Sequence, residues 1–148
     1  MAHRTTSRAT IALAALVAAL AVAGAAGARP AATLRAPREV RLGEAVTATA
    51  RNLNPGHYRL FIVLTASQGK GARPITCLGA VGPRLNVPAG ERSFHGRIPA
   101  KLTCYQGTRL GTVPNGPGID RFVLASPAGG EAFSGSRSFL ERRVRVTG

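Results

Sequence analysis

The chain has 148 residues, which suits one domain better than two. Hydrophobic residues make up 45% and charged residues 18%, and this balance excludes both a disordered polyelectrolyte and a bundle of membrane helices. Lys and Arg outnumber Asp and Glu by 20 to 6, so the protein should attract polyanions.

Residues 1–28 predict an export signal. Arg4 and Arg8, with no acidic residue near them, precede an apolar run at 11–23, and small-residue sites end at Ala25 and Ala28. Signal peptidase reads such a positive start, short apolar middle and small-residue exit. We expect cleavage after Ala28, with the earlier site as the alternative, and a secreted or envelope-associated domain at 29–148 with no transmembrane segment. An uncleaved anchor is disfavoured, because spanning a bilayer takes about 20 apolar residues.

The mature chain predicts short strands joined by turns, because 10 Pro and 18 Gly interrupt helices and all Pro lie at or after Pro30. After an extended lead-in and a short alternating stretch at 39–42, residues 45–53 (AVTATARNL) alternate between apolar and polar, as in a half-buried strand. A turn at Asn54-Pro55-Gly56 leads into 57–65 (HYRLFIVLT), which is apolar on both faces and therefore predicts a central strand.

Further along, a polar loop at 67–74 precedes a strand near 75–81, a short piece at 85–87 and a strand at 93–98 that places Phe94 and Ile98 on one face. Residues 105–118 read as one long turn-rich loop, and strands follow at 121–125 and 133–146. Seven or eight short strands separated by turns favour an all-β sandwich.

The turn and alternation pattern resembles bacterial extracellular immunoglobulin-like domains. Its opening reads Gly43-Glu44-x-Val46-x-Ala48, followed by Leu53-x-Pro55-Gly56-x-Tyr58, and strands at 122–124 and 144–146 suit the same plan. The resemblance implies a single immunoglobulin-like antiparallel β-sandwich after an N-terminal signal helix, and a tendency toward binding. The chain departs from antibody-type domains in having no Trp and in the short spacing of its cysteines.

Cys77 and Cys104 are the only cysteines, and both belong to the mature part. Two cysteines in an exported chain usually pair with each other, so we expect a disulfide. Two reduced, buried thiols are the alternative.

The residues that could carry catalysis are few and scattered. His57 and His95 have no acidic or Cys neighbours at metal-ligand spacing, and Asp120 is the only aspartate. No nucleophile elbow or phosphate-binding glycine loop occurs. We therefore expect no enzyme activity, no metal and no cofactor, and keep a small secreted hydrolase only as a remote alternative.

Binding is the expected function, and two classes of partner stay open. An extracellular protein would contact loop residues, with Tyr105 and Arg109 in the long loop after Cys104 as the main candidates. An anionic cell-surface polymer would instead meet the basic surface, which is net +12 after cleavage. Candidate residues for it are Lys70 and Arg73 in one loop, Lys101 and Arg109 near Cys104, and the closing arginines at 142, 143 and 145. A solvated surface with no ligand is the plainer interpretation of that charge. Aromatic residues are too few for base stacking, so no specific nucleic-acid binding is expected.

Overall fold

The computed structural model describes residues 27, 29–126 and 138–148, and the side chains of Ser138 and Phe139 are not among the described parts. The predicted signal segment and its cleavage site at Ala28 lie outside these residues, apart from Gly27. Residues 31–148 form one compact unit. No helix in the described part of the chain is long and apolar enough to cross a membrane.

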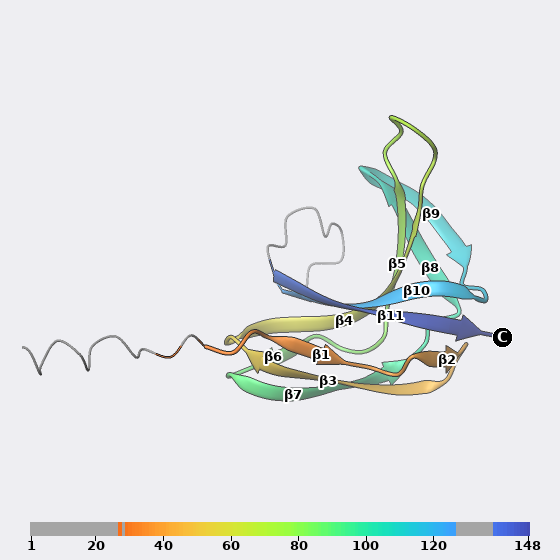
Figure 1. The fold of residues 1–148 in the computed structure, drawn as a ribbon. Helices are drawn as coiled ribbons and strands as arrows, with labels where there is room; N and C mark the ends of the chain where they lie inside the picture. Colours follow the sequence, from red (N-terminus) through yellow and green to blue (C-terminus); the bar gives the residue numbers. More distant parts are fainter. Residues whose placement is uncertain (1–26, 28, 127–137) are drawn as a thin grey trace, which may run out of the picture. The chain divides into compact units, whose positions relative to one another are not determined.

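The described residues form two β-sheets and no helix (Figure 1). The small sheet has the order β1-β3-β7, with β1 at Thr33–Arg35, β3 at Ala45–Leu53 and β7 at Gly90–Arg97. The large sheet has the order β2-β11-β10-β4-β5-β8-β9, and β6 pairs with β4 beside this path. Its strands are β2 (Glu39–Arg41), β4 (Gly56–Ala66), β5 (Ile75–Ala80), β6 (Leu85–Val87), β8 (Lys101–Gln106), β9 (Thr108–Pro114), β10 (Gly118–Ser126) and β11 (Ser138–Thr147).

The all-β class is confirmed, but two details of the predicted strand pattern are wrong. The described ranges contain eleven strands, whereas seven or eight were predicted, and β2 pairs with β11 in parallel, whereas an antiparallel sandwich was expected. The long loop at 105–118 is largely the hairpin β8–β9, which turns at Gly107 with a φ of 82°. The turn-forming cluster begins only at Pro114, so residues 108–113 are free to pair as a strand.

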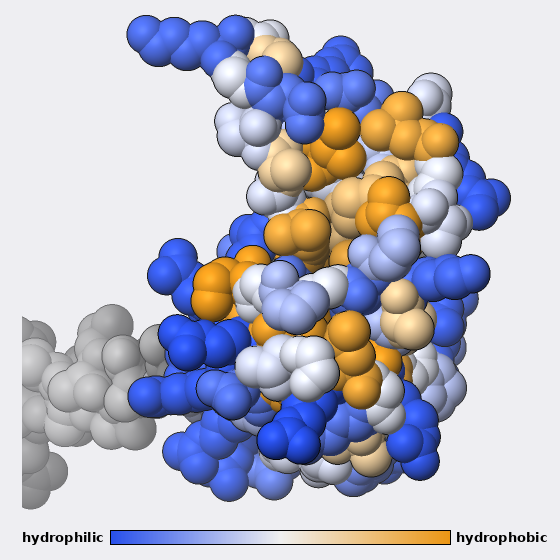
Figure 2. All heavy atoms as spheres, turned by 90° about the vertical axis from the view of Figure 1, so that its right-hand side faces the viewer, coloured by the Kyte–Doolittle hydropathy of each residue, from blue (hydrophilic) through white to orange (hydrophobic). Residues whose placement is uncertain are grey.

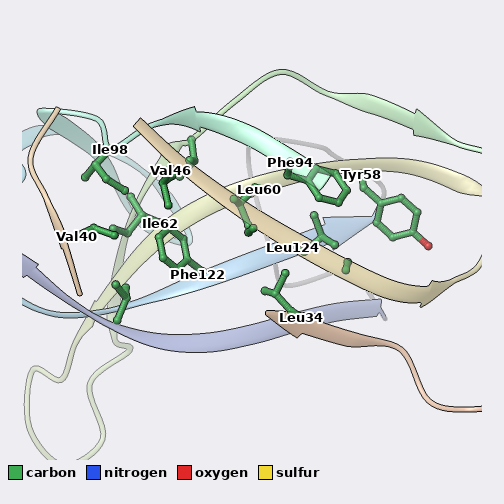
Figure 3. Close-up of a cluster of buried hydrophobic side chains, with 14 of the residues drawn as sticks. Leu34, Val40, Val46, Tyr58, Leu60, Ile62, Phe94, Ile98, Phe122 and Leu124 are labelled. Carbon is green, nitrogen blue, oxygen red and sulfur yellow. The ribbon is translucent and has the colours of Figure 1, made fainter. Parts of the chain in front are cut away.

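The main core lies between the two sheets (Figure 3). Alternation in β3 places Val46, Ala48 and Ala50 inward, as predicted. Phe94 is the ladder partner of Ala48 on the neighbouring strand β7 and lies on the same inner face, and Ile98, directly after β7, is buried in the same core. The core members drawn in Figure 3 include Leu34, Val40, Leu60, Ile62, Phe122 and Leu124. The core between the sheets is thus filled mainly by aliphatic and phenylalanine side chains, in a chain that has no Trp.

Strand β4 is central, as predicted, with β10 on one side and β5 on the other. Its second apolar face supports a smaller cluster on the outer side of the large sheet, made of Phe61, Val63, Leu78, Val123 and Ala125. The Arg59 guanidinium lies over the Phe61 ring, 5.7 Å from its centroid, in a cation–π contact. This second cluster explains why both faces of β4 read as apolar.

A close backbone crossing joins β7 to the segment after β5. Arg97 donates its N–H to the carbonyl of Val81 at 2.9 Å. A Cβ at Gly96 would lie 1.2 Å from that same carbonyl oxygen, so only glycine fits at this position. The crossing fixes the distance between the small sheet and the large one at this point.

The cysteines form the predicted disulfide. Cys77 on β5 and Cys104 on β8 are direct partners in the antiparallel ladder, with Cα atoms 3.9 Å apart. The bond therefore joins neighbouring strands of one sheet, in agreement with the short sequence spacing. Figure 1 shows β5, β8 and β9 turned away from the layer of β1, β3 and β7, and the disulfide lies in this turned part of the sheet.

Candidate functional site

The candidate site is a groove of about 620 Å³ at the edge of the sandwich, which we call the arginine groove. It is bordered by the segment from β1 to β2 on one side and by β10 and β11 on the other. Its lining consists of Arg35, Ala36, Arg38, Ile119, Arg142, Arg143, Val144 and Arg145. A hollow of about 400 Å³ shares Arg35 and Arg142 with it and continues between β1 and β11 toward Leu140.

The path of the chain between β1 and β2 creates this groove. β1 belongs to the small sheet and pairs with β3, whereas β2 belongs to the large sheet and pairs with β11. The chain crosses between the sheets at Ala36-Pro37-Arg38, and Pro37 disfavours a continued ladder because it lacks an N–H donor. The crossing brings Arg35 and Arg38 to the arginines of β11, and Arg145 donates its N–H to the carbonyl of Arg38 at 2.8 Å.

The groove concentrates positive charge. Five of its eight lining residues are arginines and none is acidic. Among the described residues, the ion pairs are Arg51–Glu91 at 2.5 Å and Arg121–Glu141 at 2.8 Å, and neither uses a groove arginine.

Two carboxylates lie near the groove without lining it. Glu39 is exposed and is the partner of Arg145 in the parallel ladder. Glu141 precedes the β11 arginines and lines the adjoining hollow, and its carboxylate pairs with Arg121. The arginine side chains around the groove are therefore available to an anion from solution.

The predicted binding residues lie in a different place. Tyr105 and Arg109 are partners across the β8–β9 hairpin, and Gln106 donates its side-chain N–H to the carbonyl of Arg73 at 2.8 Å. A Cβ at Gly107 would lie 3.1 Å from the Arg73 Nη1, so the guanidinium rests against the hairpin turn.

Three of the four candidates are thus brought together, while Lys70 is exposed within the neighbouring loop. Tyr105 is less available than a loop residue, because its ring packs against the outer apolar cluster.

The two histidines and the aspartate that the sequence analysis considered for catalysis or metal binding lie in different environments. His57 and His95 are exposed, and His95 Nδ1 lies 2.9 Å from the Thr47 hydroxyl. Asp120 is 2% exposed, and its Oδ2 has no hydrogen-bond partner among the described residues. Burial raises the pKa of Asp120 above its ordinary value. Within the described part of the chain, no three His, Cys, Asp or Glu side chains gather to hold a metal ion.

A second surface feature is apolar. Figure 2 shows hydrophobic side chains gathered on one face of the molecule, between more hydrophilic regions above and below them. Among the residues whose side chains the structure describes, the exposed large hydrophobic ones are Leu64, Leu110, Val113 and Ile119, with exposed fractions of 37% to 53%. Leu64 and Val113 lie on the inner face of the large sheet, where it turns away from the small sheet and loses its cover.

Comparisons with known proteins identify no family. No family model and no curated protein matches the chain. Among solved structures, the chain is similar to macromomycin, with 19% sequence identity and a TM-score of 0.48 over 79% of this chain and 100% of that one.

The sequence pattern pointed to part of the arginine groove. The run of Arg142, Arg143 and Arg145 is visible as a basic end to the last strand. The contribution of Arg35 and Arg38 was missed, because it depends on the crossing at Pro37 and on the parallel pairing of β2 with β11. The only sign of this contribution in the sequence is the segment Arg35-Ala36-Pro37-Arg38, in which two arginines flank a proline.

Proposed function

We propose that this chain is a secreted, non-catalytic binding module with an immunoglobulin-like fold, and that it holds an anionic ligand in the arginine groove. The observation that carries the proposal is the convergence of five arginines, from two separate parts of the chain, on the arginine groove, whose own lining contains no acidic residue. Guanidinium groups bind carboxylate, sulfate and phosphate through paired N–H donors, and closely spaced ones release several counterions when a polyanion binds.

A charge-matched pair of variants tests this function. The groove variant carries Arg35→Ser, Arg143→Ser and Arg145→Ser, and the control variant carries Arg84→Ser, Arg92→Ser and Lys101→Ser at exposed positions outside the groove. Both lose three positive charges, so general attraction to a polyanion falls equally in the two.

The measurement is the affinity for labelled polyphosphate of defined length, followed by fluorescence polarisation from about 50 to 200 mM salt. We expect the groove variant to bind at least about tenfold more weakly than the control at low salt, with a smaller dependence of log K on log salt. Equal losses in the two variants would show that the charge acts diffusely, and the groove would then have no special role.

The hairpin end formed by Arg73, Tyr105, Gln106 and Arg109 is a second candidate contact, for a protein partner. It is favoured by the hydrogen bond between Gln106 and Arg73, which joins two chain segments into one surface. A pull-down from the envelope fraction with wild type and Arg109→Ala would test it, since a hairpin contact should survive moderate salt and fail in the variant. Capture that is unchanged by Arg109→Ala would remove this candidate.

A further inference from the structure

The edge of β11 is open beside the arginine groove. On one side β11 pairs with β10 from Ser138 to Val146, which leaves out only its last residue. On the other side β2 pairs only with residues 145–147. No strand within the described ranges pairs with β11 on that side from Leu140 to Val144, and β1 passes nearby but belongs to the other sheet.

The hydrogen bonds of β2 show which main-chain groups face the open side. The Arg145 N–H donates to Arg38, and the Thr147 carbonyl accepts from the Leu42 N–H at 3.2 Å, so residues 145 and 147 direct their main-chain groups toward β2. Because this direction repeats every second residue along a strand, the N–H and C=O of Arg143 and Glu141 face the same side, beyond the end of β2. The open edge thus offers donors and acceptors in strand geometry.

The arginines lie on both faces of that edge. Arg143 and Arg145 are partners of Arg121 and Ile119 in the ladder and share the outer face, whereas Arg142 is the partner of the buried Phe122 and points to the side of the small sheet. Arg35 borders the groove from β1. A strand placed along the edge would therefore meet an arginine on each of its two faces, and on the outer face also Glu141, which lines the adjoining hollow and is ion-paired with Arg121.

We propose that the ligand of the arginine groove is an extended acidic polypeptide segment, which adds to the large sheet as a strand along residues 140–144 of β11. Five residues of strand span about 17 Å, and the groove and its adjoining hollow run beside this stretch. The added strand occupies the position that β2 would take if the chain did not cross at Pro37. Main-chain hydrogen bonds to Arg143 and Glu141 fix its register, and its carboxylates meet the arginines.

This proposal rests on the proposed function, since the same groove supplies the charge. It differs in the chemistry of the ligand: a polyphosphate or sulfated glycan uses the arginines alone, whereas a polypeptide strand also uses the open edge. Arginines along an edge could also act only to keep strands away, as charged side chains do on many natural sheets. The experiment separates these three cases.

The probe is a fluorescein-labelled hexapeptide, Glu-Val-Glu-Glu-Val-Glu, which carries charge on both faces when extended. Its control is the same peptide with N-methyl groups on alternate residues along one edge, which keeps every charge and removes the N–H donors on that edge. Because either edge could face β11, two such controls are made. Binding is measured by polarisation at about 50 mM salt to wild type and to the groove and charge-matched variants, with polyphosphate as a parallel ligand.

We expect the parent peptide to bind wild type and the charge-matched control, and to lose at least about tenfold in affinity for the groove variant. One of the two N-methylated peptides should bind at least tenfold more weakly than the parent. Hydrogen exchange should show new protection of the Arg143 amide when the parent peptide is bound. Arg143→Pro should weaken binding more than Arg143→Gln, because both remove the charge but only proline removes the N–H.

Three outcomes would overturn the strand proposal. If both N-methylated peptides bind as well as the parent while the groove variant still loses affinity, charge alone acts and the proposed function stands. If polyphosphate binds in a groove-dependent manner and the peptide does not, the ligand is a different polyanion and the proposed function again stands. If neither ligand depends on the groove arginines, both proposals fail.

Discussion

Removal of the disulfide should weaken the whole domain and loosen one hairpin more than the rest. The perturbation is the double variant Cys77→Ala with Cys104→Ala, which deletes the bond between β5 and β8. The closed loop has 28 residues counting both cysteines, since their sequence separation is 27. In the chain-entropy treatment of cross-links, a loop of this length contributes about 3.6 kcal/mol to the free energy of unfolding at 25 °C.

A local effect should accompany this global loss. The β5–β8 ladder contains three residue pairs, and the cysteines form the middle one. Among the described strands β9 pairs with β8 alone, so the β8–β9 hairpin is joined to the large sheet through this short ladder. Without the disulfide, the hairpin should open more often than the global unfolding reaction requires.

Urea unfolding measures the loss in the free energy of unfolding of the whole domain, and native-state hydrogen exchange measures the local opening of the β8–β9 hairpin. We expect a loss of about 3–4 kcal/mol in the free energy of unfolding, and faster exchange in residues 101–114 than in β3 or β10. Thr103→Ala serves as the control, because it alters the same ladder and keeps the disulfide. A loss below about 1 kcal/mol, with exchange in the hairpin unchanged, would refute the reasoning.

Three further changes test the packing. Gly96→Ala should cost more than about 3 kcal/mol in urea unfolding because of the backbone crossing, whereas Gly116→Ala, with no atom within 4 Å of its added Cβ, should be almost neutral. Phe122→Ala should cost about 3–5 kcal/mol, and Leu110→Ala, 53% exposed, under 1 kcal/mol. Burial raises the folded-state pKa of Asp120 above its ordinary 3.8, so wild type should lose stability relative to Asp120→Asn as pH rises from about 4 through that pKa. If the free energies of unfolding of wild type and Asp120→Asn change with pH in parallel, the argument from Asp120 is wrong. If Gly116→Ala destabilises the protein as much as Gly96→Ala does, the steric argument is wrong.

Local patterns in the sequence predicted the strands that carry the core. The alternation of Val46, Ala48 and Ala50 and the two-sided apolar run of β4 each depend on side-chain periodicity, which a strand displays directly. The pairing of Cys77 with Cys104 followed from the number of cysteines. These features need no knowledge of which strand neighbours which.

The features that the sequence pattern missed depend on neighbours in space. Strand β9 is exposed along most of its length, so it lacks the alternation that would mark it, and its turn requires only one glycine. The parallel pairing of β2 with β11 joins residues about a hundred positions apart, and three-residue strands carry almost no periodic signal. The arginine groove could not be predicted for the same reason, since two of its arginines, Arg35 and Arg38, come from the chain crossing before β2.

The open edge and the positive charge of β11 have a common physical consequence. The main-chain groups of an unpaired strand edge can pair with another strand whatever its sequence, including the same edge of a second copy of the chain, unless side chains prevent it. Arg142, Arg143 and Arg145 make that self-pairing unfavourable, because like charges would lie opposite one another across the new ladder. The same charges favour an acidic strand, so one set of side chains both disfavours the wrong partner and attracts the proposed one. We therefore expect the large positive charge of the domain to matter most at the β11 edge, where main-chain hydrogen-bonding groups lack a partner strand among the described residues.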